Sequence, residues 1–193
     1  SIDELPLQDL QNFWSLLYMD FCRKICTDHP AEGETVIRRA IAETGRRQGE
    51  WQRQEHEQMG LNTNLHSFFL DGRGAVCDPR SAAAVHTRNT EVCLWDRYIC
   101  PMANYWAAHS AEAYGRFYCE EYMRAFLSGY TGGKGQFHLS KVLTDKRDIL
   151  CQFAAYFRPA NLELEQRRKA FESTPVRQEA PVGSFSDYIR EKA

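Results

Sequence analysis

The feature that most constrains the fold is a pair of alternating runs in the second half of the chain, QFHLSKVLT (136–144) and ILCQFAAYF (149–157). The four residues DKRD join them, and two alternating runs with a short link are typical of an antiparallel β-hairpin. Because strand side chains alternate, His138 is predicted on the face opposite Phe137 and Leu139. One face of the second strand is predicted to point to the core, carrying Ile149, Cys151, Phe153, Ala155 and Phe157.

Two amphipathic helices are predicted ahead of this hairpin. Between Leu7 and Cys26, apolar residues recur three and four positions apart, which is the spacing of one helical stripe: Leu7, Leu10, Phe13, Trp14, Leu17, Phe21 and Ile25. A second helix is predicted from Glu34 to about Met59, with an inward face of Val36, Ile37, Ala40, Ile41, Thr44 and Trp51. Gly45 and Gly49 lie four apart on one face of it, which favours close packing against another helix.

The segment between the helices and the hairpin mixes several signals. HSFFL (66–70) is consistent with a short strand, and TEVCLWDRYI (90–99) has the β-branched and aromatic content of one. Pro101 suits the first turn of a long helix that ends at SGYTGGKG (128–135), and Gly115 is predicted to bend or split that helix. The predicted class is therefore α+β, with N-terminal helices packed on an antiparallel β-sheet and a long central helix.

The length of the chain, 193 residues, suits a single domain over 1–193. Within it we distinguish a helical part (1–60), a core (90–158) and a C-terminal extension (159–193).

With 24 basic and 26 acidic residues the chain carries no strong field of one sign, so we expect a small-molecule substrate and neither a nucleic-acid nor a membrane partner. No apolar run of membrane-spanning length or signal-peptide pattern is present, and an odd count of seven cysteines favours reduced thiols. We therefore expect a cytoplasmic protein.

Metal and cofactor sites are not predicted. Only Cys22 and Cys26 approach the spacing of a ligand pair, and a free cysteine on a helix is more often buried in a core. The six histidines form no spaced ligand motif, and neither a nucleophile elbow nor a phosphate-binding glycine loop is present.

Three cysteines occupy special places in the predicted elements. Cys100 stands at the entry of a helix, where the dipole and free N–H groups favour a thiolate. Cys119 lies farther along, next to Glu120 and Glu121, which as helix neighbours cannot share a face. Cys151 points to the core. The alternative for all three is a buried cysteine with a purely structural role.

The segments around these three cysteines can be compared with a known sequence signature. The Cys-Pro at 100–101, GRFYCEE (115–121) and VLTDKRDILCQF (142–153) occur in the order of a C-terminal signature, over about Tyr98 to Phe157. This region resembles the L-2-amino-thiazoline-4-carboxylic acid hydrolase family. The family has an aspartate three residues after the helical cysteine, where this chain has Tyr122. The resemblance implies hydrolytic opening of a small heterocycle, a cyclic amidine or isothiourea, by thiol and carboxylate chemistry.

The resemblance also implies roles for individual residues. The nucleophile would be Cys100 or Cys119, with Cys151 close by. Glu120 or Glu121 would serve as acid and base, and His109 or His138 as proton carrier. A flat pocket would be lined by Trp95, Tyr98 and Trp106, and Arg97 or Arg116 would hold a substrate carboxylate.

Two other functions stay open. The same fold could be a non-catalytic domain that binds or senses a small molecule, in which the cysteines only pack. It could also be a subunit of a homo-oligomer or complex whose aromatic helix docks a partner. Thiol reactivity separates the first of these from an enzyme.

Overall fold

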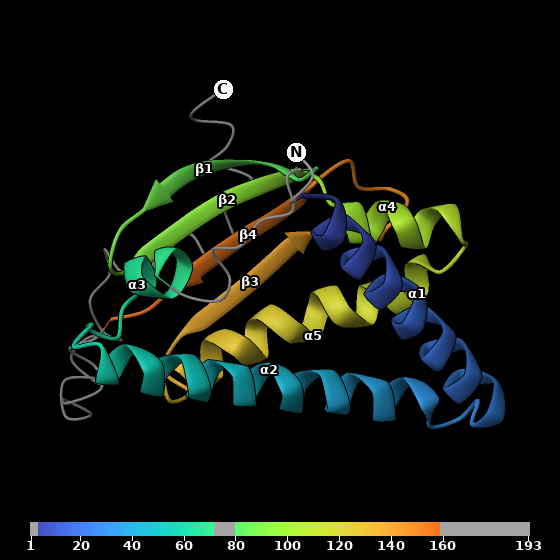
Figure 1. Cartoon of the computed structure of the whole chain (residues 1–193), viewed down its shortest axis with the longest axis horizontal. Helices are drawn as coiled ribbons and strands as arrows, with labels where there is room; N and C mark the ends of the chain where they lie inside the picture. The colour runs from blue at the N-terminus through green and yellow to red at the C-terminus, as the bar shows by residue number, and fades with distance from the viewer. Residues whose placement is uncertain (1–3, 72–79, 159–193) are drawn as a thin grey trace.

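The computed structural model describes residues 4–71 and 80–158. Five helices and four strands follow each other in these ranges as α1 (Glu4–Asp28), α2 (Gly33–Gln58), α3 (Leu65–Leu70), β1 (Ala82–Arg88), β2 (Val92–Ile99), α4 (Pro101–Ala108), α5 (Glu112–Tyr130), β3 (Gln136–Lys141) and β4 (Cys151–Tyr156). The strands form one antiparallel sheet in the order β1-β2-β4-β3 (Figure 1). The predicted α+β class is confirmed. The predicted C-terminal extension and Cys77 lie outside the described residues.

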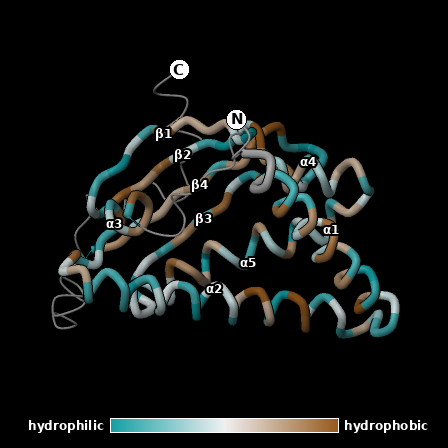
Figure 2. The backbone as a smooth tube through the Cα atoms, viewed as in Figure 1, coloured by the Kyte–Doolittle hydropathy of each residue, from teal (hydrophilic) through white to brown (hydrophobic). Residues whose placement is uncertain are grey.

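The helices cover one face of this sheet, which we call the inner face. Helix α5 packs against β3, and α2 runs alongside α5 at the bottom of Figure 1. The main core lies between the sheet, α3 and α5, and its buried side chains include Leu65, Phe68, Trp95, Phe126, Leu127, Tyr130, Phe137, Phe153 and Phe157. A second cluster includes Ile37 and Ile41 of α2 and Phe117 of α5, so α5 lies between α2 and the sheet. Figure 2 shows the hydropathy of each residue along these elements. None of the described helices is long and apolar enough to cross a membrane.

Close packing of α2 on α5 depends on glycine, as predicted from the spacing of Gly45 and Gly49. A Cβ atom at Gly49 would lie 2.1 Å from the carbonyl oxygen of Phe126, and one at Gly45 would lie 2.6 Å from that of Tyr122. On α5, Gly129 meets the backbone of α2 equally closely. The two helix backbones therefore touch, and a larger residue at these positions would push them apart.

The predicted inward stripe of α1 is wrong in part. Leu10, Phe13 and Phe21 are about 60% exposed, and Leu17 is also exposed, whereas Ser15, Met19 and Cys22 are the buried residues of α1. The helix has apolar residues on more than one face, and periodicity alone does not decide which face is buried. On α2, Ile37 and Ile41 are buried as predicted, but the other residues of the predicted inward face are exposed, namely Val36, Ala40, Thr44 and Trp51.

The helix predicted after Pro101 is split, but at Ser110 and not at Gly115. Ser110 adopts a positive φ of 53° between α4 and α5. Gly115 lies inside α5 for a packing reason, because a Cβ there would lie 2.3 Å from the ring of Trp106. The bend that the glycine suggested is therefore absent, and the glycine makes room for the indole.

The predicted hairpin forms from β3 and β4, with Phe137 opposite Ala155 and Leu139 opposite Phe153. Its connection is longer than four residues, because the strands end at Lys141 and begin again at Cys151. Cys151, Phe153, Ala155 and Phe157 are buried as predicted, but Ile149 precedes the strand and is 84% exposed. HSFFL is not a strand but part of α3, which begins where the Asn64 side chain accepts a hydrogen bond from the Ser67 N–H.

Candidate functional site

The three cysteines singled out in the sequence come together in the fold. Cys100 is the N-cap of α4, Cys119 lies in the middle of α5, and Cys151 is the first residue of β4. Cys119 is close enough to both of the others for their charges to interact, and Cys100 interacts with Cys151 in the same way. We call these three residues the thiol cluster. Residues 51 positions apart in the chain thus share one site.

Two of the three thiols are held in the neutral form. Burial raises the pKa of Cys119 far above its usual value, and the neighbouring Cys100 and Cys151 raise it further. A hydrogen bond with Thr144 lowers this pKa, but by less. Burial also raises the pKa of Cys151 to about 11, although the Leu143 N–H donates to its Sγ over 3.2 Å. At neutral pH both therefore carry a proton, and neither is an activated thiolate.

Cys100 differs from these two in its position at a helix start. Its backbone is extended, its carbonyl accepts the first helical hydrogen bond from the Asn104 N–H, and Pro101 occupies the first helical position. The side chain makes no capping hydrogen bond, so it does not satisfy the free N–H groups of the first turn itself. Cys100 is 7% exposed.

Arg97 is the charged residue of the thiol cluster. It stands opposite Cys151 in the pairing of β2 with β4, and both belong to the inner face of the sheet, with Trp95 and Phe153. Its positive charge acts to lower the pKa of Cys151 and of Tyr118, against the larger effect of burial. No carboxylate in the described parts of the chain forms an ion pair with Arg97. Its guanidinium is therefore available to an anion, either a thiolate or a substrate group.

The predicted acid–base carboxylates belong to a separate ion-pair network between α2 and α5. Arg38 donates to Glu120 over 2.7 Å and to Glu121 over 3.2 Å. Arg116 adds a bond of 2.5 Å to Glu120, and Arg124 pairs with Glu121. Burial alone would raise the pKa of Glu120, but the hydrogen bonds from Arg116 and Arg38 hold it below its usual value. Glu120 is therefore ionised at neutral pH and paired with two arginines.

The predicted proton carriers lie away from the thiols. His138 is on the outer face of the sheet against Tyr156, as its strand position predicted, and burial lowers its pKa. His109 caps the other end of α4 from Cys100, about 14 Å along the helix axis. It is exposed, stacks on Tyr105 and hydrogen-bonds the Tyr105 carbonyl. The fold does not bring either histidine to the thiol cluster.

The three aromatic residues predicted to line a flat pocket differ in burial and in their contacts. Trp95 is a core residue stacked on Phe153 with ring centroids 4.7 Å apart, and Tyr98 is 47% exposed. Trp106 is fully buried, and its indole N–H donates to the Ser15 carbonyl over 3.1 Å. Of the two predicted carboxylate-binding arginines, Arg116 is already paired with Glu120 and Asp145.

No protein-family model matches this chain, and no curated protein matches it. The site is therefore interpreted from its own geometry. No group of three or more His, Cys, Asp or Glu residues in the described ranges is arranged to hold a metal ion. The thiol cluster places one sulfur at the start of α4 beside two protonated thiols and the Arg97 guanidinium.

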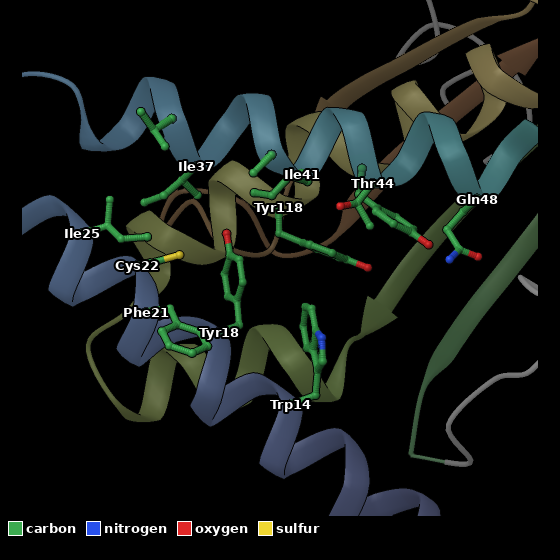
Figure 3. Close-up of a pocket in the computed structure, with 13 residues that line it drawn as sticks. Trp14, Tyr18, Phe21, Cys22, Ile25, Ile37, Ile41, Thr44, Gln48 and Tyr118 are labelled. Atoms are coloured by element: carbon green, nitrogen blue, oxygen red, sulfur yellow. The ribbon is translucent and has the colours of Figure 1, made fainter.

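An open cavity of about 450 Å³ lies next to the thiol cluster, between α1, α2 and α5 (Figure 3). We call it the helical pocket. It is lined by Trp14, Tyr18, Phe21, Cys22, Ile25, Val36, Ile37, Ala40, Ile41, Thr44, Gln48, Tyr118 and Tyr122. Tyr118 belongs to both places, because its hydroxyl interacts with the charges of Cys119, Cys100 and Arg97.

Sequence reasoning missed Tyr118 and the helical pocket, although a signal was present. Tyr114, Tyr118 and Tyr122 lie four apart on α5, and Trp14, Tyr18 and Cys22 lie four apart on α1. Residues at that spacing share one face of a helix. The two faces meet in the fold, since the ring centroids of Trp14 and Tyr118 are 5.1 Å apart.

Proposed function

We propose that this protein is a hydrolase that opens a small heterocycle by thiol chemistry, with Cys100 as its nucleophile. The observation that carries the proposal is the position of Arg97 beside three clustered cysteines, where its guanidinium has no carboxylate partner among residues 4–71 and 80–158. An arginine in this place can bind a substrate carboxylate and stabilise a thiolate. The resemblance to the thiazoline-carboxylate hydrolase family, which suggested these same cysteines and Arg97, supports the proposal.

The proposed roles follow from the surroundings of each thiol. Cys100 is the candidate nucleophile because it stands at the N-cap of α4, next to first-turn N–H groups that its side chain does not bond. Cys119 and Cys151 keep their protons at neutral pH, so they can donate a hydrogen bond or a proton but do not attack. Glu120 and Glu121 hold α2 and α5 together in this scheme and take no part in proton transfer.

The proposed reaction adds one water to a cyclic amidine. The Cys100 thiolate forms a bond to the ring carbon that lies between heteroatoms, and the C=N electron pair moves to the ring nitrogen, which takes a proton from a neighbouring thiol. The lone pair of the exocyclic nitrogen then forms a C=N bond as the ring C–N bond breaks, and a proton from the exocyclic nitrogen passes to the ring nitrogen, which leaves as an amine. Water adds across the new C=N bond, with its oxygen on the carbon and one proton on the nitrogen. The C–S bond to Cys100 then breaks, which restores the Cys100 thiolate, while the remaining proton of the water oxygen returns to the neighbouring thiol and leaves a carbonyl.

The experiment combines turnover with labelling of each thiol. Purified protein is incubated with 2-aminothiazoline-4-carboxylate and related cyclic amidines, and the released amine is measured. In parallel, iodoacetamide labelling of every cysteine is followed by peptide mass spectrometry with and without substrate. We expect Cys100 to label fastest near neutral pH and to be protected by the substrate. Cys100→Ser should lose turnover, whereas Cys26→Ser, outside the cluster, should keep it.

A non-catalytic binding domain is the second candidate, favoured by the raised pKa of Cys119 and Cys151. It predicts slow labelling of all thiols and no released amine, while a bound carboxylate still protects the site. Equal turnover of the Cys100→Ser variant and the unmodified protein would refute the nucleophile assignment.

A further inference from the structure

We infer that the helical pocket is a binding site for an uncharged, flat, largely apolar molecule, separate from the hydrolytic site proposed above. Its cavity of about 450 Å³ has the size of pockets that bind small ligands, which run from about 300 to 1,000 Å³. All of its lining residues belong to three helices, so its shape is fixed by helix packing (Figure 3).

Aromatic rings form two walls of the helical pocket. Trp14 stacks on Tyr18 with an interplanar angle of 8°, and Tyr118 stacks on Tyr122 with an angle of 14°. The two stacks meet edge to face, since the rings of Trp14 and Tyr118 are inclined by 65°. Such walls present both ring faces and ring edges, and flat π systems bind favourably to either.

The remaining wall is aliphatic and comes from α2. Figure 3 shows Ile37 and Ile41 facing Tyr18 and Trp14 across the space between α2 and α1. No residue that lines the helical pocket carries a charge. A charged ligand would therefore lose its hydration without gaining an ion pair, so the site favours a neutral one.

A few polar groups limit what the neutral ligand can be. The Tyr18 hydroxyl donates to the Tyr114 carbonyl over 2.8 Å, so it is already used inside the protein. Thr44 and Gln48 stand one turn apart at the end of the pocket away from Cys22, and they supply a hydroxyl and an amide. We therefore expect an aromatic or fused-ring molecule with one or two hydrogen-bonding groups at one end.

The test uses two probes that differ by one charge. N-phenyl-naphthylamine is neutral, and anilinonaphthalene sulfonate has the same rings with a sulfonate added. Fluorescence titration of the full chain should show saturable, one-to-one binding of the neutral probe. The sulfonate should bind at least about ten-fold more weakly, because no basic side chain lines the pocket.

Matched variants locate the bound probe. Thr44→Glu puts a carboxylate into the pocket and should weaken binding of the neutral probe by about ten-fold or more. Two control variants put a carboxylate at exposed positions outside the pocket. Thr35→Glu is the same substitution elsewhere on α2, and Phe13→Glu adds a carboxylate to the exposed face of α1. Both should bind the probe within about two-fold of the unchanged protein. Circular dichroism of each variant checks that the helices are intact.

Three results would overturn the inference. The first is no saturable binding of the neutral probe, and the second is equal weakening by Thr44→Glu and Thr35→Glu. The third is a loss of probe binding as protein concentration and oligomer size rise together, which would mean that a second copy of the chain covers the pocket. None of these readouts requires turnover, so the inference stands or fails independently of the proposed hydrolase.

Discussion

Arg97 on β2 and Cys151 on β4 stand directly opposite each other in the antiparallel pairing, with both residues on the inner face of the sheet. Cys100, three residues after Arg97, is close enough to Cys151 from the start of α4 to raise its pKa. The guanidinium and the thiols are thus placed by strand pairing and by the turn from β2 into α4, which are rigid parts of the fold. This arrangement makes Arg97 the most informative residue to change.

Arg97→Gln should slow alkylation of the cluster and weaken binding of carboxylate substrates. Loss of the positive charge raises the pKa of Cys151 further, and it removes the group proposed to bind the substrate carboxylate. For an amidine with a carboxylate we expect KM to rise by about ten-fold or more, and much less for its carboxamide analogue. An equal change for both analogues would mean that Arg97 only supports the fold.

Cys151 should label slowly near neutral pH and faster as the pH rises toward its pKa of about 11. Its reactive thiolate is scarce below that value, because burial favours the neutral form. Labelling in denaturant is the control, since the unfolded thiol has an ordinary pKa and should react rapidly. A native Cys151 that labels at the unfolded rate near neutral pH would contradict the buried position.

The raised pKa of Cys151 predicts how the free energy of unfolding changes with pH. Its folded pKa lies above the usual value of 9.0, so the fold stabilises the protonated thiol relative to the unfolded chain. This contribution to stability is fully present below about pH 9 and is lost as the pH rises toward 11. Cys151→Ser should therefore flatten the fall in unfolding free energy on the alkaline side.

Gly49→Ala should destabilise the protein, because the new methyl would lie 2.1 Å from the Phe126 carbonyl oxygen. Overpacking of this kind costs about 1–3 kcal/mol, which exceeds the gain in helix propensity of about 1 kcal/mol. Urea unfolding measures the difference. Arg39→Ala on the exposed face of α2 is the control and should change stability by less than about 0.5 kcal/mol.

The sequence alone predicts the parts of the fold that repeat regularly. Alternation predicted the hairpin, three–four spacing predicted α1 and α2, and the glycine pair on α2 predicted close packing against another helix, which is α5. It could not decide between helix and strand for HSFFL, because a short apolar run fits both periods and the Asn64 cap settles the matter. Nor could it identify the buried face of α1, where Cys22 is buried and Phe21 is exposed.

Local position in the sequence did not determine which of the candidate residues lie together in the fold. The three cysteines were named from local position, yet their convergence depends on the pairing of β2 with β4. The carboxylates were assigned to catalysis because they follow Cys119, but a helix turns by about 100° per residue. Cys119 packs in the core under the sheet. Arg38 on α2 pairs with both Glu120 and Glu121, although adjacent helix residues were expected on different faces, because its long side chain reaches both carboxylates.

Ser110 should tolerate glycine but not a β-branched residue. Its φ of 53° lies in the left-handed region, which costs most for Val and least for Gly. Ser110→Val is expected to lower the free energy of unfolding by about 1–2 kcal/mol, and Ser110→Gly to leave it nearly unchanged. Thermal or urea unfolding tests this, and equal stability of both variants would argue against the break between α4 and α5 at this residue.

The Glu120 ion pairs should stabilise the fold at neutral pH and lose that effect in acid. Its folded pKa lies below the usual 4.5 because Arg116 and Arg38 donate hydrogen bonds to it, so the stabilisation is present above pH 4.5 and is lost as the pH falls through the folded pKa. Glu120→Gln should therefore reduce the urea midpoint near neutral pH, by a free energy on the order of 1 kcal/mol, but change it little in strong acid. Glu43→Gln, which weakens only a 4.0 Å exposed pair with Arg47, is the matched control and should leave both midpoints nearly unchanged. If the loss in Glu120→Gln were as large in acid as at neutral pH, the carboxylate would act through packing and not through charge.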